Sequence, residues 1–223
     1  MTLFNRPTLV TITAPTCSGK SFLLEKLTKE SDSFTKITST TTRAQRVGEV
    51  EGVDYNFISR YESNLMEEHG EFAELIEFRG NRYGVTKKEM AAKMTSGKTP
   101  IIILEPKGLA IYEQLCRESG WGIYTIFIST VEQTRLERLN IRTEANIRRS
   151  VMRFGETSDW LGNSYNELQS IVEEHTSRVL SITGDERLWH GQRGWDITVS
   201  GDDANKAIDD IYRGIEWFNK KLK

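Results

Sequence analysis

The sequence predicts an α/β fold with a doubly wound parallel sheet, and three features of the chain support this prediction. Short, β-rich and nearly continuous apolar runs, as expected of parallel strands buried on both faces, occur at 8–13, 101–104, 124–129 and 195–200. Segments with helical periodicity separate these runs. A glycine-lysine-serine motif follows the first run, where a strand should pass into a helix. The alternation of strand, loop and helix favours a doubly wound sheet.

The expected helices follow the strands in order. They are KSFLLEKLTKE (20–30), TKKEMAAKMTSG (86–97), GLAIYEQLCRESG (108–120), VEQTRLERLNI (131–141) and ANKAIDDIYRGIEWFNKKL (204–222). The segment 36–85 breaks the alternation, because TSTTTR, DYNFIS and EFAELIEFRGNRYGV look like short antiparallel strands with turns. We expect this segment to form a small lobe over the carboxyl edge of the main sheet, where ligands bind in such folds.

Composition limits the class of protein. The 223 residues carry a formal net charge of −2, which gives no global reason to expect binding to nucleic acid or to a membrane. Cys17 and Cys116 are far apart and form neither a metal-binding spacing nor a disulfide framework. No apolar run approaches the ~20 residues of a membrane span, and the start of the chain is too polar for a signal peptide. We therefore expect a soluble, cytoplasmic protein with reduced thiols.

The stretch VTITAPTCSGKS, residues 10–21, is a candidate phosphate-binding loop. Backbone N–H groups of a small-residue loop surround phosphate oxygens, the lysine neutralises charge and the serine hydroxyl reaches a bound Mg²⁺. The usual pattern is G-x-x-x-x-G-K-[ST], and Ala14 stands here in place of the first glycine. Alanine keeps the side chain small but loses free access to positive φ. The loop residues are Ala14, Pro15, Thr16, Cys17, Ser18, Gly19, Lys20 and Ser21.

Three segments resemble the guanylate kinase family in content and in order: APTCSGKS (14–21), STTTRAQRVGEVEGVDYNF (39–57) and EFAELIEFRGNRYGV (71–85). Many NTPases share the first segment. The second, with its TTR-x-x-R-x-GE-x-x-G-x-DY-x-F pattern, is highly specific. The resemblance covers roughly 8–145 and resumes at the last strand and helix.

The resemblance implies one P-loop NTPase domain over 1–223 that binds ATP at the phosphate loop. Its expected parts are a core at 1–35, 86–134 and 195–223, a small antiparallel NMP-binding lobe at 36–85, a helical lid at about 135–150 and a helical insertion at about 155–194. The insertion is longer than the usual connection of the family, and its YNELQSIVEEHTSRVL stretch has helical periodicity. Trp160, Trp189 and Trp195 indicate that it packs on the body or on a partner subunit.

The resemblance also implies that the small lobe holds a nucleoside monophosphate, GMP or dGMP. Two arginines, three apart in a loop, can fork onto one phosphate group, which two tyrosine hydroxyls also bind in the family. A carboxylate suits the N1–H and 2-amino groups of guanine, because two adjacent donors need a two-oxygen acceptor. A serine and a second acidic residue approach the same base in the family. The matching residues are Arg43 and Arg46, Tyr55 and Tyr83, Glu74, Ser39 and Glu105.

Simpler roles stay open for these side chains: solvated loop arginines, tyrosines in the core of the lobe, and a Glu74 exposed on a strand. The sequence also departs from the family at three positions. Glu105 replaces an aspartate, Ile103 replaces an aspartate linked to the water shell of the metal, and Val85 replaces a hydroxyl that contacts the base. Losing that hydroxyl leaves guanine O6 unpaired and opens apolar room beside the base. An altered or broadened base specificity, including a modified base, is therefore the alternative.

Five arginines cluster in RLERLNIRTEANIRRS, residues 135–150. In the family, arginines on a helical lid close over the triphosphate and stabilise charge on the transferred phosphoryl group. Arg138 and Arg142 match two of them by spacing, and Arg149, or its neighbour Arg148, matches the third. The alternative is an exposed helix whose arginines form salt bridges with glutamates of the same segment.

The resulting hypothesis is a kinase that transfers the γ-phosphoryl group of ATP to GMP or dGMP, as a monomer or homodimer. Phosphoryl transfer needs positioning and charge neutralisation, which Lys20, Mg²⁺ held through Ser21, and the lid arginines supply. Two other classes stay open. A non-catalytic guanylate kinase-like binding module has typically lost the phosphate loop, and a sugar-phosphate kinase would not need Glu74 or the tyrosine of DY-x-F.

Overall fold

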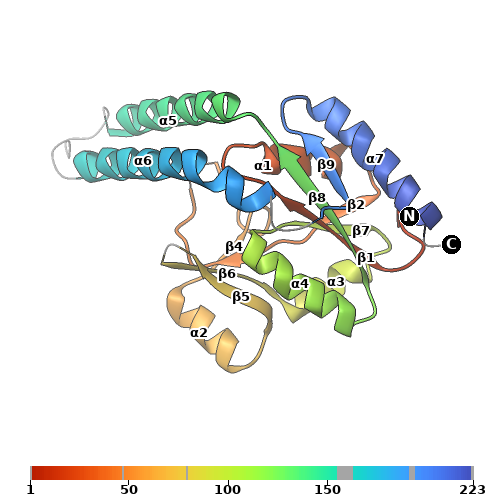
Figure 1. Ribbon diagram of the computed structural model, residues 1–223. Helices are drawn as coiled ribbons and strands as arrows, with labels where there is room; N and C mark the ends of the chain where they lie inside the picture. The colour runs from red at the N-terminus through yellow and green to blue at the C-terminus, as the bar shows by residue number, and fades with distance from the viewer. Residues whose placement is uncertain (1, 47, 79, 155–162, 191–193, 222–223) are drawn as a thin grey trace.

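Strands and helices alternate along the computed structural model, which describes residues 2–46, 48–78, 80–154, 163–190 and 194–221 (Figure 1). The strands are β1 (Thr8–Thr13), β2 (Phe34–Lys36), β3 (Thr40–Thr41), β4 (Asn56–Phe57), β5 (Phe72–Phe78), β6 (Asn81–Thr86), β7 (Thr99–Ile103), β8 (Gly122–Ser129) and β9 (Ile197–Ser200). The helices are α1 (Lys20–Glu30), α2 (Arg60–Glu68), α3 (Lys87–Met94), α4 (Pro106–Glu118), α5 (Glu132–Phe154), α6 (Asn163–His190) and α7 (Ala204–Lys221).

The main sheet is parallel, with the strand order β2-β7-β1-β8-β9. Its middle strand β1 is buried along its whole length, with Val10 opposite Ile101 of β7 and Tyr124 of β8. Burial on both faces explains why this strand reads as a continuous apolar and β-branched run. The four strands expected from such runs are confirmed as β1, β7, β8 and β9, and the predicted α/β fold class with them. The short edge strand β2 was not predicted.

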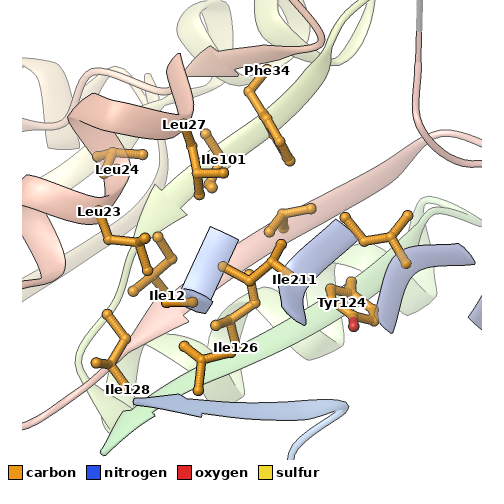
Figure 2. Packing of buried hydrophobic residues seen from close by; sticks show 14 of the residues in the cluster. Ile12, Leu23, Leu24, Leu27, Phe34, Ile101, Tyr124, Ile126, Ile128 and Ile211 are labelled. Carbon is orange, nitrogen blue, oxygen red and sulfur yellow. The ribbon is translucent and has the colours of Figure 1, made fainter. Parts of the chain in front are cut away.

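Helices cover both faces of this sheet. On one face, Leu27 of α1 and Ile211 of α7 pack on Ile12 of β1 and Ile126 of β8 (Figure 2). On the other face, α3 and α4 pack on the opposite side chains of the same strands, which include Leu9 of β1. Each face therefore has its own apolar core, as a doubly wound sheet requires.

The second sheet is small and has the strand order β4-β3-β6-β5. β5 and β6 form an antiparallel pair, and β3 pairs antiparallel with β6, as predicted for 36–85. The β3–β4 pair is parallel, so the expectation of antiparallel strands is wrong there. Gly84 on β6 is required by space, because an added Cβ would lie 2.4 Å from the Glu74 carbonyl oxygen. Helix α2, which lies between β4 and β5, was not predicted.

Helices α5 and α6 form a long hairpin that extends away from the main sheet (Figure 1). A single helix, α5, spans the whole segment in which the lid was expected, and α6 contains the periodic stretch of the expected insertion. Trp195 stacks on Phe127 of β8, with ring centroids 5.0 Å apart. Trp160 and the side chain of Trp189 lie outside the described residues. Within the described ranges, no helix is both long enough and apolar enough to cross a membrane.

Candidate nucleotide-binding site

The phosphate loop joins the end of β1 to the start of α1. Two of its residues have left-handed backbones, Cys17 at φ 62° and Gly19 at φ 92°. Cys17 is the one non-glycine residue with a positive φ among those described, and Ala14 is fully buried. The alanine in place of the first glycine therefore meets no backbone conflict, because the left-handed turn falls three residues later. The loop closes at the N-terminus of α1, where unpaired N–H groups favour an anion.

Lys20 is the first residue of α1 and its side chain folds back on the loop. Its ammonium donates to the carbonyl oxygens of Ala14 at 2.6 Å and Pro15 at 3.0 Å. Burial lowers the pKa of Lys20, while the carboxylate of Glu105 acts to raise it. The charge is thus held at the loop by weak acceptors that phosphate oxygens can replace.

The residues around Lys20 fit a magnesium ion. Ser21 is exposed beside it on α1, and the carboxylate of Glu105, at the N-terminus of α4, is close enough to act on the Lys20 ammonium. The described residues contain no group of three or more His, Cys, Asp or Glu side chains that could form a protein-only cage. A site with one or two protein oxygens, completed by water and phosphates, is what Mg²⁺ prefers. Ser21 is therefore the residue that could hold it, with water and phosphate oxygens as the other ligands.

The structure brings Arg43, Tyr55 and Tyr83 together in the small lobe. The Arg43 guanidinium lies 5.4 Å from the Tyr55 ring centroid, and the two tyrosine rings are 6.2 Å apart. Arg43 also forms a bidentate ion pair with Glu49, at 2.8 Å, and Glu49 accepts from the backbone N–H of Arg46. The role of Glu49 was not predicted, although it is the glutamate of the R-x-GE motif. Its carboxylate fixes Arg43 over the tyrosine rather than leaving it solvated.

Glu74 lies inward on β5 opposite Val85 on β6, and its exposure is only 8%. The hydroxyl of Tyr112, on α4, donates to Glu74 Oε2 at 3.4 Å. Burial raises the pKa of Glu74 to about 7, and the Tyr112 bond acts in the opposite direction. The alternative of an exposed strand carboxylate is thus wrong. Val85 is packed in the core beneath α4, so the expectation that it opens room beside a base is also wrong.

The two other residues predicted to bind the base are Ser39 and Glu105. Ser39 is half-buried at the start of the lobe, and its carbonyl accepts from the backbone N–H of Asn56 at 2.9 Å. Glu105 directly precedes α4, and its negative charge acts to raise the pKa of Lys20 in the phosphate loop. Tyr112 was missed by sequence reasoning, because its helical spacing indicates only a buried face.

The arginines of α5 occupy different environments. Arg138 donates to the carbonyl oxygens of Gly201 at 2.8 Å and Cys17 at 3.4 Å, so it reaches the phosphate loop. Arg135 is fully buried and donates to the Ile182 carbonyl of α6 at 3.3 Å. Arg149 is exposed and lies about 16 Å along the helix axis from Arg138, at the helical rise of 1.5 Å per residue.

Helix α6 contributes charged residues that were not predicted. Glu174 Oε1 accepts from Arg46 Nη2 of the small lobe at 2.9 Å and from Arg178 Nη2 at 2.6 Å. Burial acts to raise the pKa of Glu174, but the net effect is a lowered pKa, because Arg178, Arg46 and Arg142 surround it. The pKa of Arg142 is lowered by desolvation and by the positive charges of Arg178 and Arg46. The i, i+4 spacing of Glu174 and Arg178 in the sequence could have indicated that the two form an ion pair on one face of a helix.

Comparison with known proteins assigns the family. The family model described as guanylate kinase matches residues 6–176, which is most of the chain. The chain belongs to the guanylate kinase family. It is 38% identical over 133 residues to the guanylate kinase of Chlamydia felis, a match that covers 59% of this chain and 63% of that protein. A guanylate kinase of Pseudomonas fluorescens is 40% identical over 101 residues, 45% of this chain and 49% of that protein.

The matches thus span slightly less than two thirds of the Chlamydia felis protein and about half of the Pseudomonas fluorescens protein. A solved guanylate kinase structure, from Anaplasma phagocytophilum, shares the fold with a TM-score of 0.60 at 20% sequence identity. That likeness covers 97% of this chain and 88% of the other. The family match ends at residue 176, inside α6.

Proposed function

We propose that the protein is a nucleoside monophosphate kinase that transfers the γ-phosphoryl group of ATP to GMP or dGMP, giving ADP and GDP or dGDP. The observation that carries the proposal is the link from acceptor lobe to phosphate loop. Arg46 of the lobe and Arg178 of α6 share the Glu174 carboxylate, and Arg138 of the adjoining helix α5 donates to the Cys17 carbonyl of the loop. Two phosphate-binding regions that lie this close are suited to direct transfer between two bound nucleotides.

The chain's own residues provide charge and alignment in this mechanism. Lys20 exchanges its carbonyl partners for phosphate oxygens of ATP, and Arg138 lies beside the loop to neutralise the same charge. Arg43 and Arg46 hold the acceptor phosphate in line with the donor. An acceptor phosphate oxygen forms the new P–O bond, while the β–γ bridging P–O bond breaks and its electron pair leaves with ADP. No protein nucleophile is needed.

Ser21 would hold a magnesium ion at this site, and the ion, when bound, would supply further neutralisation of the triphosphate. We also propose a cytoplasmic protein, monomeric or homodimeric, whose partners are nucleotides and not nucleic acid.

The experiment that tests the function is a coupled assay of ADP formation with ATP and a panel of ribo- and deoxynucleoside monophosphates. The expected ranking by kcat/KM places GMP and dGMP first. If a pyrimidine nucleoside monophosphate has the highest kcat/KM, the assignment of guanine as the base is overturned, but the assignment as a kinase is retained. Turnover of phosphorylated sugars alone, or no turnover, would overturn the kinase reading in favour of the sugar-phosphate kinase or the binding module.

An altered base specificity is the second candidate, and one observation favours it. Burial raises the pKa of Glu74 to about 7, so its protonated form is available at neutral pH. A protonated carboxyl donates one hydrogen bond, so it can pair with a purine whose N1 is an acceptor. Modified purines in the same panel test this candidate, and a modified base that outranks GMP would establish it.

A further inference from the structure

One carboxylate oxygen on α6 pairs with two arginines, one from the small lobe and one from the same helix. Glu174 Oε1 lies 2.9 Å from Arg46 Nη2 and 2.6 Å from Arg178 Nη2, and Arg178 Nε adds a third bond at 3.0 Å. Arg46 belongs to the loop that the family resemblance assigns to the acceptor phosphate. The geometry around this oxygen is that of a phosphate oxygen between two guanidinium groups.

Arg178 lies on α6 beside the stretch of α5 that holds Arg138. Two contacts between these helices flank it, from Arg135 to the Ile182 carbonyl and between Thr143 and His175. Its side chain is 17% exposed, and its positive charge acts to lower the pKa of both Lys20 and Arg142. The positive charges of Arg46, Arg142 and Arg178 thus lie around the single carboxylate of Glu174. Such a concentration of positive charge in a partly buried site favours a polyanion with more charge than one carboxylate.

The arginines near the end of α5 do not share this environment. Arg148 is 77% exposed, and its nearest acidic partner is Glu144, 4.0 Å away on the same helix. Arg149 beside it is also exposed, about 16 Å along the axis from Arg138. The third phosphate-binding arginine expected at 148 or 149 therefore lies far along α5 from Arg138, which contacts the loop, whereas Arg178 on α6 is level with Arg138.

We propose that Arg178 contacts the transferred phosphoryl group, in place of the arginine expected on α5, and that Glu174 is its positioning residue. The proposal rests on the kinase function proposed above. Before substrates bind, the carboxylate holds Arg46 and Arg178 at the spacing that two adjacent phosphates need. On binding, the acceptor phosphate takes Arg46, the γ-phosphoryl group takes Arg178, and Glu174 retains one Arg178 N–H as its orienting partner.

Arg178→Ala, Arg178→Lys and the matched control Arg149→Ala test the proposal with two readouts. Turnover of ATP and GMP should fall by about 100-fold in Arg178→Ala, mainly in kcat, and recover partly in Arg178→Lys. Affinity for a guanosine–adenosine bisubstrate ligand with five bridging phosphates should weaken by about tenfold or more in Arg178→Ala. Arg149→Ala should stay within about twofold of the unsubstituted protein in both readouts.

Chemical rescue separates contact from structural support. Free guanidinium ion at millimolar concentration should restore part of the turnover of Arg178→Ala, because it can occupy the emptied site, and should restore none in Lys20→Ala. Glu174→Gln should tighten binding of inorganic phosphate, because the competing carboxylate charge is removed, while kcat falls. If Arg178→Ala and Arg149→Ala show equal turnover and equal affinity for the bisubstrate ligand, the inference about Arg178 is overturned. The proposed kinase function would not be affected. If the unsubstituted protein shows no turnover but Arg178→Ala still weakens binding of the bisubstrate ligand, the proposed kinase function is overturned. Arg178 would then remain a phosphate-binding residue.

Discussion

The Tyr112 hydroxyl on α4 donates to Glu74 Oε2 on β5 at 3.4 Å, across a contact in which both side chains are almost completely buried. The bond joins a helix of the core to a strand of the small lobe. It also opposes the burial that raises the pKa of Glu74 to about 7. The charge state of the proposed base-binding carboxylate therefore depends on a residue outside the lobe.

Tyr112→Phe should raise the pKa of Glu74 further, because the bond that stabilises the carboxylate is lost. Guanine needs the ionised form, so kcat/KM for GMP should increase as pH rises through about 7 in the unsubstituted protein. In Tyr112→Phe the midpoint of this increase should move to higher pH. Tyr124→Phe is the control, because it removes another buried hydroxyl that is remote from Glu74. Equal midpoints in all three proteins would contradict the proposed coupling.

Glu74 should also make stability depend on pH. The ordinary pKa of a glutamate is 4.5, and burial raises the pKa of Glu74 to about 7 in the folded protein. Between these pH values the folded state therefore binds more protons than the unfolded state. The free energy of unfolding should therefore decrease as pH rises from 4.5 to about 7, by on the order of 3 kcal/mol at most. Urea unfolding across this range measures it. In Glu74→Gln this decrease in the free energy of unfolding should vanish. If the free energy of unfolding of Glu74→Gln still depends on pH to the same extent, other groups cause the dependence.

Breaking the Arg43–Glu49 pair should weaken the acceptor lobe. Both side chains are mostly buried, at 13% and 19% exposure, so Glu49→Ala leaves the Arg43 charge without its carboxylate. We expect a loss of about 1–3 kcal/mol in the free energy of unfolding and a higher KM for GMP. Glu77→Ala is the matched control, because its pair with Arg60 is exposed and should contribute less than about 1 kcal/mol. Similar losses in the two variants would contradict this account.

The two ends of the phosphate loop should respond differently to glycine and alanine. Gly19→Ala forces a Cβ onto a backbone at φ 92° and should cost about 1–2 kcal/mol of stability and weaken ATP binding. Steric contact is not the reason, because the added Cβ would be 3.6 Å from Arg138 Nη1. Ala14→Gly should leave kcat/KM for ATP within about twofold, since the left-handed turn lies elsewhere. A large gain in ATP affinity from Ala14→Gly would show that the missing glycine limits the loop.

Local patterns predicted the parts of the protein that depend on neighbours in sequence. The burial of β1 and the loop before Lys20 follow from one apolar run and one motif. The continuity of α5 could also have been read from the chain, because no glycine or proline occurs between 131 and 154. Segment β2 has only three residues, too few for a periodicity to be recognised.

Contacts between distant segments could not be predicted in the same way. Arg46 and Glu174 are 128 positions apart, and Tyr112 and Glu74 are 38 apart. Helical spacing indicates that Tyr112 is buried but not what its hydroxyl meets. The family resemblance placed the third lid arginine at 148 or 149, whereas the packing of α6 on α5 places Arg178 beside Arg138. Tertiary packing, and not local propensity, decides these positions.

The most direct test of the kinase mechanism is the rate of GDP formation from ATP and GMP by the unsubstituted protein and by Lys20→Ala. Lys20 is held at the phosphate loop, where it can neutralise the donor phosphates. The unsubstituted protein should form GDP, and Lys20→Ala should lower kcat by about 10³-fold or more while its circular dichroism stays unchanged. Near-normal GDP formation by a folded Lys20→Ala variant would contradict the mechanism.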